Sequence, residues 1–260
     1  MDIDDDSEQN SVGRSNRKHI RRSGKARFKK TQLKPHLKAQ WCIPSGDNGA
    51  FVAAMEDILD LYCLPYDRLC PVICMDEKPY QLLAERREPI PMKPGSKKKI
   101  DNEYERMGTC SVFVMTEPLT GWHYTHARQR RTAEDWAYEI RELLTVHFPN
   151  VPKIRLVLDN LNTHVLASLY KVFPPKEARE LAKRIEFHYT PKHGSWLNMA
   201  EISISVLSRQ CLCRRIDSID FLNEQLNAWT AERIKNHEPI NWQFANDKAR
   251  IKLRHLYPQH

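Results

Sequence analysis

What this sequence has little of already narrows its class. Glycine is scarce, at 8 of 260 residues. No apolar run approaches the roughly 20 residues that a membrane-spanning helix needs. The first ten residues, MDIDDDSEQN, are acidic where an export signal would be basic and then apolar. The composition, with 41% hydrophobic and 28% charged residues, is typical of a soluble globular protein. We therefore expect no membrane association and a cytoplasmic location.

Matched sets of cysteines are also lacking. The chain has 7 cysteines, an odd number, and is long enough to bury a core without disulfide bonds. This usage indicates free thiols in a reducing compartment. Cys70 with Cys74, and Cys211 with Cys213, are closely spaced, but neither pair has a second pair of Cys or His at zinc-ligand spacing. We interpret all four as core cysteines rather than zinc ligands.

One long segment lacks negative charge altogether. Between Asn10 and Gln40 eleven residues are Lys or Arg and none is Asp or Glu, and the whole chain has a formal net charge of +8. Such a surplus attracts a polyanion, because Lys and Arg contact phosphates without regard to sequence. Solubility alone is the plainer alternative. The DNA-binding residues predicted in this segment are Arg14, Arg17, Lys18, Arg21, Arg22, Lys25, Arg27, Lys29 and Lys30.

Hydrophobic periodicity predicts alternating strands and helices in the rest of the chain. We expect strands over 71–76, 109–116, 122–127, 154–159 and 185–189, and helices over 50–63, 132–148, 176–183 and 196–212 and from Ser218 onward. The segment 83–105 is rich in Pro and Lys and is expected to be a loop. This order specifies an α/β fold, a mixed sheet with helices on its faces.

The same patterns suggest four parts. Residues 1–32 hold few large apolar side chains, so we expect a disordered segment that is acidic and then basic. Residues 33–70 are expected to be a helical linker region, and 71–235 the main α/β domain. Residues 236–260 form a basic C-terminal tail that packs on the domain or follows it.

Three acidic residues stand at positions suited to metal chemistry. Asp76 and Asp159 each end a predicted strand, and strands that are neighbours, about 4.8 Å apart, would bring both carboxylates to one end of the sheet. Two anions so close favour a divalent cation, and hard oxygen ligands favour Mg²⁺. Glu201, at the edge of a helical apolar stripe, supplies a third ligand. Taken singly, each acid is more often surface charge or a helix cap.

The sequence around these acids resembles a known family. The strings CMDEKPYQLL, VLDNLNTH and HYTPKHGSWLNMAEISISVLSRQ are similar to the three catalytic blocks of the bacterial insertion-sequence transposases of the IS six-thirty group, within the Tc/mariner-like DDE superfamily. The resemblance extends from about Lys34 and includes the segment Glu85–Pro91, RRTAEDWA and the terminal DKARIKLRHLYP. It implies an RNase H-like fold, like that of retroviral integrases, with a five-stranded mixed sheet and helices on both faces.

The resemblance also implies an activity. By motif match, Asp76, Asp159 and Glu201 take the three metal-ligand roles, with two Mg²⁺ ions that Mn²⁺ could replace. Two ions about 3.5–4 Å apart activate the attacking oxygen and stabilise the leaving oxygen of a phosphodiester displacement. The implied reactions are cleavage of transposon ends by water, then attack of the freed 3′-hydroxyl on target DNA, typically at TA.

Four further residues match motif positions near the triad, namely Asn160, His164, His193 and Asn198. Four residues separate His164 from Asn160, so the two could share a helix face and touch a phosphate, or form a helix cap. His193 with Gly194 suggests either a loop that approaches DNA or a simple turn. We interpret Trp196 as a core residue rather than a platform for base stacking.

Members of this family usually carry an N-terminal helix-turn-helix region, and the sequence before Leu33 has too few apolar residues to build one. We therefore expect a DDE enzyme with weak preference for particular transposon ends, acting as a homodimer on terminal repeats and target DNA, with a separate helix-turn-helix product as a possible partner. The expected location is the bacterial cytoplasm, at the nucleoid when bound to DNA. The alternative is a catalytically silent, truncated remnant that only binds DNA or dimerises.

Overall fold

The computed structural model describes residues 48–236 and 239–258, which belong to one compact unit spanning Ile43–His260. The basic residues predicted to bind DNA, from Arg14 to Lys30, lie outside the described residues. Within the described part, no helix is both long and apolar enough to traverse a bilayer.

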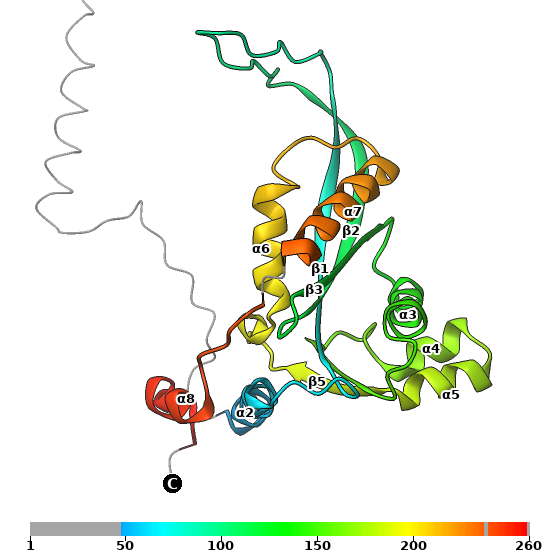
Figure 1. The fold of residues 1–260 in the computed structure, drawn as a ribbon, viewed down its shortest axis with the longest axis vertical. Helices are drawn as coiled ribbons and strands as arrows, with labels where there is room; N and C mark the ends of the chain where they lie inside the picture. The colour runs from blue at the N-terminus through cyan, green and yellow to red at the C-terminus, as the bar shows by residue number, and fades with distance from the viewer. Residues whose placement is uncertain (1–47, 237–238, 259–260) are drawn as a thin grey trace, which may run out of the picture. The chain divides into compact units, whose positions relative to one another are not determined.

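A mixed sheet of five strands forms the centre of this unit, in the order β3-β2-β1-β4-β5 (Figure 1). β1 pairs antiparallel with β2 and parallel with β4, while β2 and β3 are antiparallel and β4 and β5 are parallel. The strands are β1 (Val72–Glu85), β2 (Tyr104–Glu117), β3 (Trp122–Arg128), β4 (Ile154–Asp159) and β5 (Ile185–Thr190). This arrangement confirms the predicted five-stranded α/β sheet.

Helices cover both faces of the sheet, as predicted. One face carries α3 (Ala133–Glu142), its π-helical extension η1 (Leu143–His147), α4 (Leu166–Val172) and α5 (Pro175–Lys183). On the other face α6 (Ala200–Gln210) and α7 (Ile219–Asn236) pack against β1 to β3 (Figure 1). The same face, near β4 and β5, carries α2 (Gly49–Cys63), η2 (Ser195–Leu197), α8 (Asn246–Lys252) and η3 (Arg254–Leu256).

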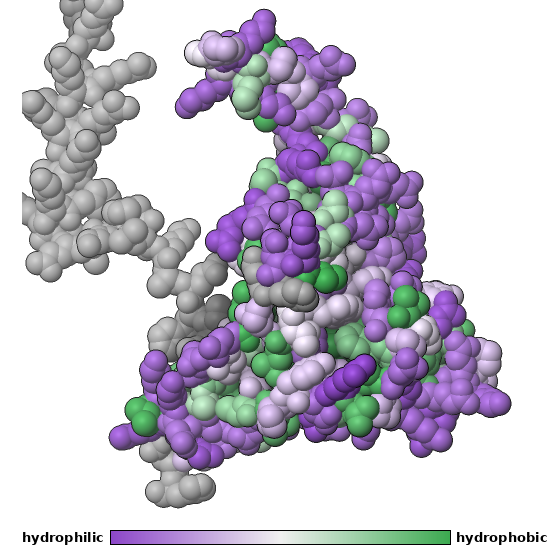
Figure 2. All heavy atoms as spheres, in the orientation of Figure 1, coloured by the Kyte–Doolittle hydropathy of each residue, from purple (hydrophilic) through white to green (hydrophobic). Residues whose placement is uncertain are grey.

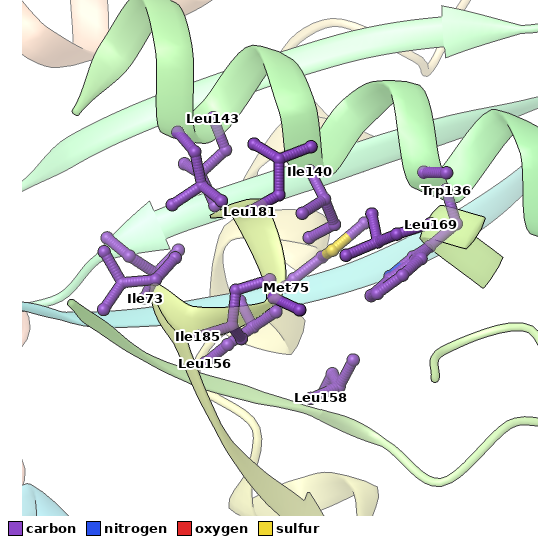
Figure 3. Packing of buried hydrophobic residues seen from close by; sticks show 14 of the residues in the cluster. Ile73, Met75, Trp136, Ile140, Leu143, Leu156, Leu158, Leu169, Leu181 and Ile185 are labelled. Carbon is purple, nitrogen blue, oxygen red and sulfur yellow. The ribbon is translucent and has the colours of Figure 1, made fainter. Parts of the chain in front are cut away.

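Strand alternation divides β1 between two hydrophobic clusters. Ile73 and Met75 are fully buried in the cluster under α3 to α5, shown in Figure 3. Cys74, between them, is buried in the cluster of α2 and η2 on the opposite face. Because successive strand residues point to opposite faces, Asp76 lies on the Cys74 face and Glu77 on the Met75 face.

Local sequence explains the α3 boundary. Thr132 and Asp135 form a capping box, in which each side chain binds the other residue's backbone N–H. Trp136 and Ile140, on the apolar face of this helix, are fully buried, as the periodicity predicts. The apolar stripe predicted in α6 is likewise buried along its whole length.

The predicted end of the first strand at Asp76 is wrong, because β1 continues to Glu85. After Cys74, β1 pairs with β2 alone, so its other edge has no partner strand there. Pro79, which cannot donate a backbone hydrogen bond, is tolerated in this part of the strand. The loop predicted over 83–105 is correspondingly shorter. Backbone bridges join Ile90 with Lys99 and Lys93 with Ser96, so the segment extends the β1–β2 hairpin into an arm whose surface is mostly hydrophilic (Figure 2).

Two side chains predicted to lie in the core are exposed. Trp196 is 41% exposed, and its ring packs edge-on against Phe244 at 6.1 Å between centroids. Cys213 is also exposed, whereas Cys74 and Cys211 are buried and Cys70 is half-buried. The helix predicted over 196–212 starts later than expected, because η2 and a turn precede α6.

We expect Phe113→Ala to lower the free energy of unfolding by about 3–5 kcal/mol, because the ring is fully buried beneath α3 and its loss leaves a cavity. Phe221→Ala is the matched control, since that ring is 40% exposed, and its effect should stay within about 1 kcal/mol. Urea unfolding measures both. Equal losses would contradict the placement of Phe113 in the core.

Candidate active site

The two aspartates lie level with each other on adjacent parallel strands. β1 and β4 pair with Cys74 opposite Val157. The same offset, carried two residues further, brings Asp76 level with Asp159, which ends β4. Since Cys74 and Val157 both belong to the cluster on the α2 face, alternation puts both carboxylates toward that face as well.

Glu201 comes to the same region from the first turn of α6. The start of this helix is tied to β1 by Asn198, whose Nδ2 donates to the Met75 carbonyl oxygen at 2.7 Å while its Oδ1 accepts from the Ala200 N–H at 3.1 Å. Asn198 is only 2% exposed, so it holds the helix rather than facing solvent. The residue it binds immediately precedes Asp76, and this contact places Glu201, itself exposed, close to Asp76.

The electrostatics of Asp76 reflect this crowding. Burial raises the pKa of its carboxyl to about 7. Part of this rise in pKa comes from the negative charges of Glu201, Asp159 and Glu77, whereas a hydrogen bond of 2.7 Å that Asp76 Oδ1 accepts from the Glu77 N–H lowers the pKa. A site that disfavours its own carboxylate charge in this way favours a bound cation.

A buried histidine lies behind Asp159. The side chain of His164 is 1% exposed, with Nδ1 at 2.8 Å from Asp159 Oδ1 and Nε2 at 2.9 Å from Glu77 Oε1. Nδ1 is also aligned with the Asp159 carbonyl oxygen, at 3.2 Å, so the contact with Oδ1 is an ion pair rather than an aligned hydrogen bond. Burial lowers the pKa of His164, but the contacts with the two acids outweigh it and raise the pKa to about 9.

These positions correct the predictions for His164. A phosphate contact is wrong because the ring is buried, and a shared helix face with Asn160 is wrong because α4 begins only at Leu166. Sequence reasoning missed Glu77 as well. The only signal for Glu77 in the sequence is its position next to Asp76. On a strand, that position places Glu77 on the opposite face of the sheet, where a buried acid needs a partner.

A cleft of about 440 Å³ adjoins Asp159 and is lined by Asp159–Leu161, Thr190–His193 and Ser195. Asn160 and His193 are both exposed there. His193 has a φ of 66°, and Gly194 closes the turn by donating to the Pro191 carbonyl oxygen at 2.8 Å. A Cβ on Gly194 would lie 2.6 Å from the Pro191 ring, so only glycine fits. The tight turn holds His193 at the cleft.

The acids fit a hydrated divalent ion better than a closed cage. Among the described residues, no three His, Cys, Asp or Glu side chains gather tightly enough to enclose a metal ion. Mg²⁺, however, keeps several waters and takes only one or two carboxylates along with phosphate oxygens. The side chain of Asp159 is 37% exposed at the cleft, and Asp76 carries an unfavourable charge. Both observations suit a cation held by the carboxylates and an incoming phosphate.

A five-stranded mixed sheet, with Asp159 at the end of β4 and Asp76 on the neighbouring parallel strand β1, defines the chain as an RNase H-like domain. Residues 71–223 match the family described as DDE superfamily endonuclease, and the chain belongs to that family. None of the curated proteins matches it.

Solved structures agree on the fold. The Mos1 transposase paired-end complex with the left transposon end matches at 13% identity and a TM-score of 0.51, covering 91% of this chain and 78% of that chain. The Mos1 strand transfer complex matches at 13% identity and a TM-score of 0.52, covering 90% of this chain and 78% of that chain. The chain is thus a member of the DDE superfamily endonuclease family with a fold like that of the Mos1 transposase structures.

Because the pKa of Asp76 is raised, we expect Asp76→Asn to increase the free energy of unfolding of the metal-free protein by an amount that depends on pH. A carboxyl with an ordinary pKa of 3.8 and a folded pKa of about 7 binds its proton more tightly when folded. The parent therefore loses stability as pH rises across that window and does not regain it above. Asn carries no charge, so the variant should be more stable than the parent by up to about 4 kcal/mol at pH 8.

Urea unfolding in EDTA between pH 4 and pH 8 measures this gain, which should shrink toward pH 4. Asp247→Asn is the control, since its side chain is 95% exposed, and it should show no such trend. A difference between parent and Asp76→Asn that does not change with pH would contradict the burial of this carboxyl.

Proposed function

We propose that this chain cuts DNA at transposon ends with water and then joins the freed 3′-hydroxyl to target DNA, typically at TA. The observation that carries the proposal is that Asp76 and Asp159 each lie two residues beyond the last paired residues of the neighbouring parallel strands β1 and β4, and that Asp159 and Glu201, on α6, both raise the pKa of Asp76. Membership of the DDE endonuclease family supports this assignment of the three acids.

In this proposal Asp76, Asp159 and Glu201 hold Mg²⁺, in two ions that Mn²⁺ can replace. When bound, the ions activate the attacking oxygen and stabilise the leaving oxygen of the displacement. Asp76 contributes by giving up its proton as a cation arrives, since its carboxyl is held where the charged form is disfavoured. Lys192 and His193 line the adjacent cleft and are exposed, which suits contacts with a phosphodiester backbone.

The proposed partners are transposon terminal repeats and target DNA, bound by a homodimer, with a separate helix-turn-helix product as a further partner. The Mos1 complexes with a transposon end and after strand transfer support DNA as the substrate class. We also propose assignment to the bacterial IS six-thirty group, and hence a place in the bacterial cytoplasm at the nucleoid, on the sequence blocks around the three acids.

The test is nicking of supercoiled plasmid by the full chain with Mg²⁺ or Mn²⁺. Asp159→Asn, Asp76→Asn and Glu201→Gln should each lower the rate by roughly 100-fold or more, because each removes a metal ligand while keeping its size. Glu180→Gln, an exposed acid on α5, is the matched control and should leave the rate unchanged.

Two outcomes would contradict the proposal. If all three variants nick DNA at the parent rate, the acids are not the metal ligands. If the parent binds DNA but does not nick with either metal, the chain is the silent DNA-binding remnant instead.

A further inference from the structure

The buried pair Glu77–His164 has no part in the proposed reaction, yet it contacts one of the proposed metal ligands. Both side chains are almost inaccessible, at 4% for Glu77 and 1% for His164, so neither can touch DNA. They lie on the α3 face of the sheet, behind Asp159, whose side chain is 37% exposed and lines the cleft. The side-chain contact of the pair with the proposed metal ligands is made by His164 to Asp159.

His164 is fixed from several directions. Its ring stacks on Trp136, with 5.8 Å between centroids and 29° between planes. Its carbonyl oxygen accepts a hydrogen bond of 2.8 Å from the Tyr189 hydroxyl. Beside it, Ser168 Oγ donates to the Thr163 carbonyl oxygen at 2.7 Å and holds the turn before α4. Neither the ring nor its backbone is free to move away from Asp159.

The two ring nitrogens of His164 contact different acids. Nε2 lies 2.9 Å from Glu77 Oε1, which sets the ring's orientation. Nδ1 then faces Asp159, at 2.8 Å from Oδ1 and 3.2 Å from the backbone carbonyl oxygen. One carboxylate oxygen of Asp159 is thereby held against the ring, and the rest of the group is left to the cleft. Metal ligands in proteins are commonly oriented by a second residue that contacts them from behind. Here His164 would orient Asp159, and Glu77 would orient His164.

We propose that Glu77 and His164 are positioning residues that fix the carboxylate of Asp159 in the orientation that binds the divalent ion. This inference rests on the proposed role of Asp159 as a metal ligand. A purely structural role for the pair would stabilise the fold without affecting metal affinity.

Two substitutions of His164 test the contributions of its two ring nitrogens separately. His164→Asn keeps a donor near the position of Nδ1, facing Asp159, whereas His164→Gln keeps one near Nε2, facing Glu77. We expect His164→Gln to bind Mn²⁺ about 10- to 100-fold more weakly than the parent, and His164→Asn to stay within about 5-fold of it. Electron paramagnetic resonance of the DNA-free full chain measures Mn²⁺ affinity, and thermal unfolding is recorded on the same samples.

His188→Gln is the matched control, because His188 is also held between two acids, Asp57 at 2.8 Å and Glu186 at 3.3 Å, but lies away from the triad. It should alter thermal stability without changing Mn²⁺ affinity. Glu77→Gln keeps the size and an acceptor for His164, so it serves if both His164 variants fail to fold. It should weaken Mn²⁺ binding several-fold.

The outcomes distinguish this inference from the proposed function. If Asp159→Asn leaves both nicking and Mn²⁺ affinity unchanged, the role of Asp159 fails, and the inference fails with it. If Asp159→Asn loses both, while the folded His164 and Glu77 variants bind Mn²⁺ like the parent, only the inference fails. Equal weakening by His164→Asn and His164→Gln would also overturn it, because the donor facing Asp159 would then be irrelevant.

Discussion

The pleat of β1 is the constraint on which the site depends. Over three residues the strand sends Met75 into the core, Asp76 toward α6 and Glu77 back beneath the sheet. A slip of one residue against β4 would exchange these faces, placing the acid in the core and the methionine in the site. The buried cluster around Met75 therefore fixes the register, and the register determines where the carboxylate of Asp76 lies.

Holding that carboxylate in place works against stability. The raised pKa of Asp76 shows that the folded chain disfavours its charge, and Asp159 and Glu201 add to the repulsion. The stabilising contributions lie elsewhere, in fully buried side chains such as Phe113 and Trp136 on the other face. Packing on both faces of the sheet lets the fold tolerate carboxylates that repel one another.

The sequence predicted the features that depend on local pattern and missed those that depend on partners. The start of a helix at Thr132, the buried stripe of α6 and the presence of five strands follow from spacing and periodicity. The extension of β1 does not, because it depends on β2 pairing past the end of β4. The burial of His164 and the exposure of Trp196 were also unpredictable, since each depends on which residues pack nearby. Glu77 was missed because its partner, His164, lies 87 residues further along the chain.

The three acids are not held in the same way. Asp76 and Asp159 are each held by backbone pairing, Asp76 opposite Val114 of β2 and Asp159 opposite Thr190 of β5. Glu201 stands on a helix whose start is tied to β1 through the hydrogen bond from Asn198 to the Met75 carbonyl oxygen. Any change in the spacing of the three carboxylates is therefore expected first at α6, because Asp76 and Asp159 are part of paired strands.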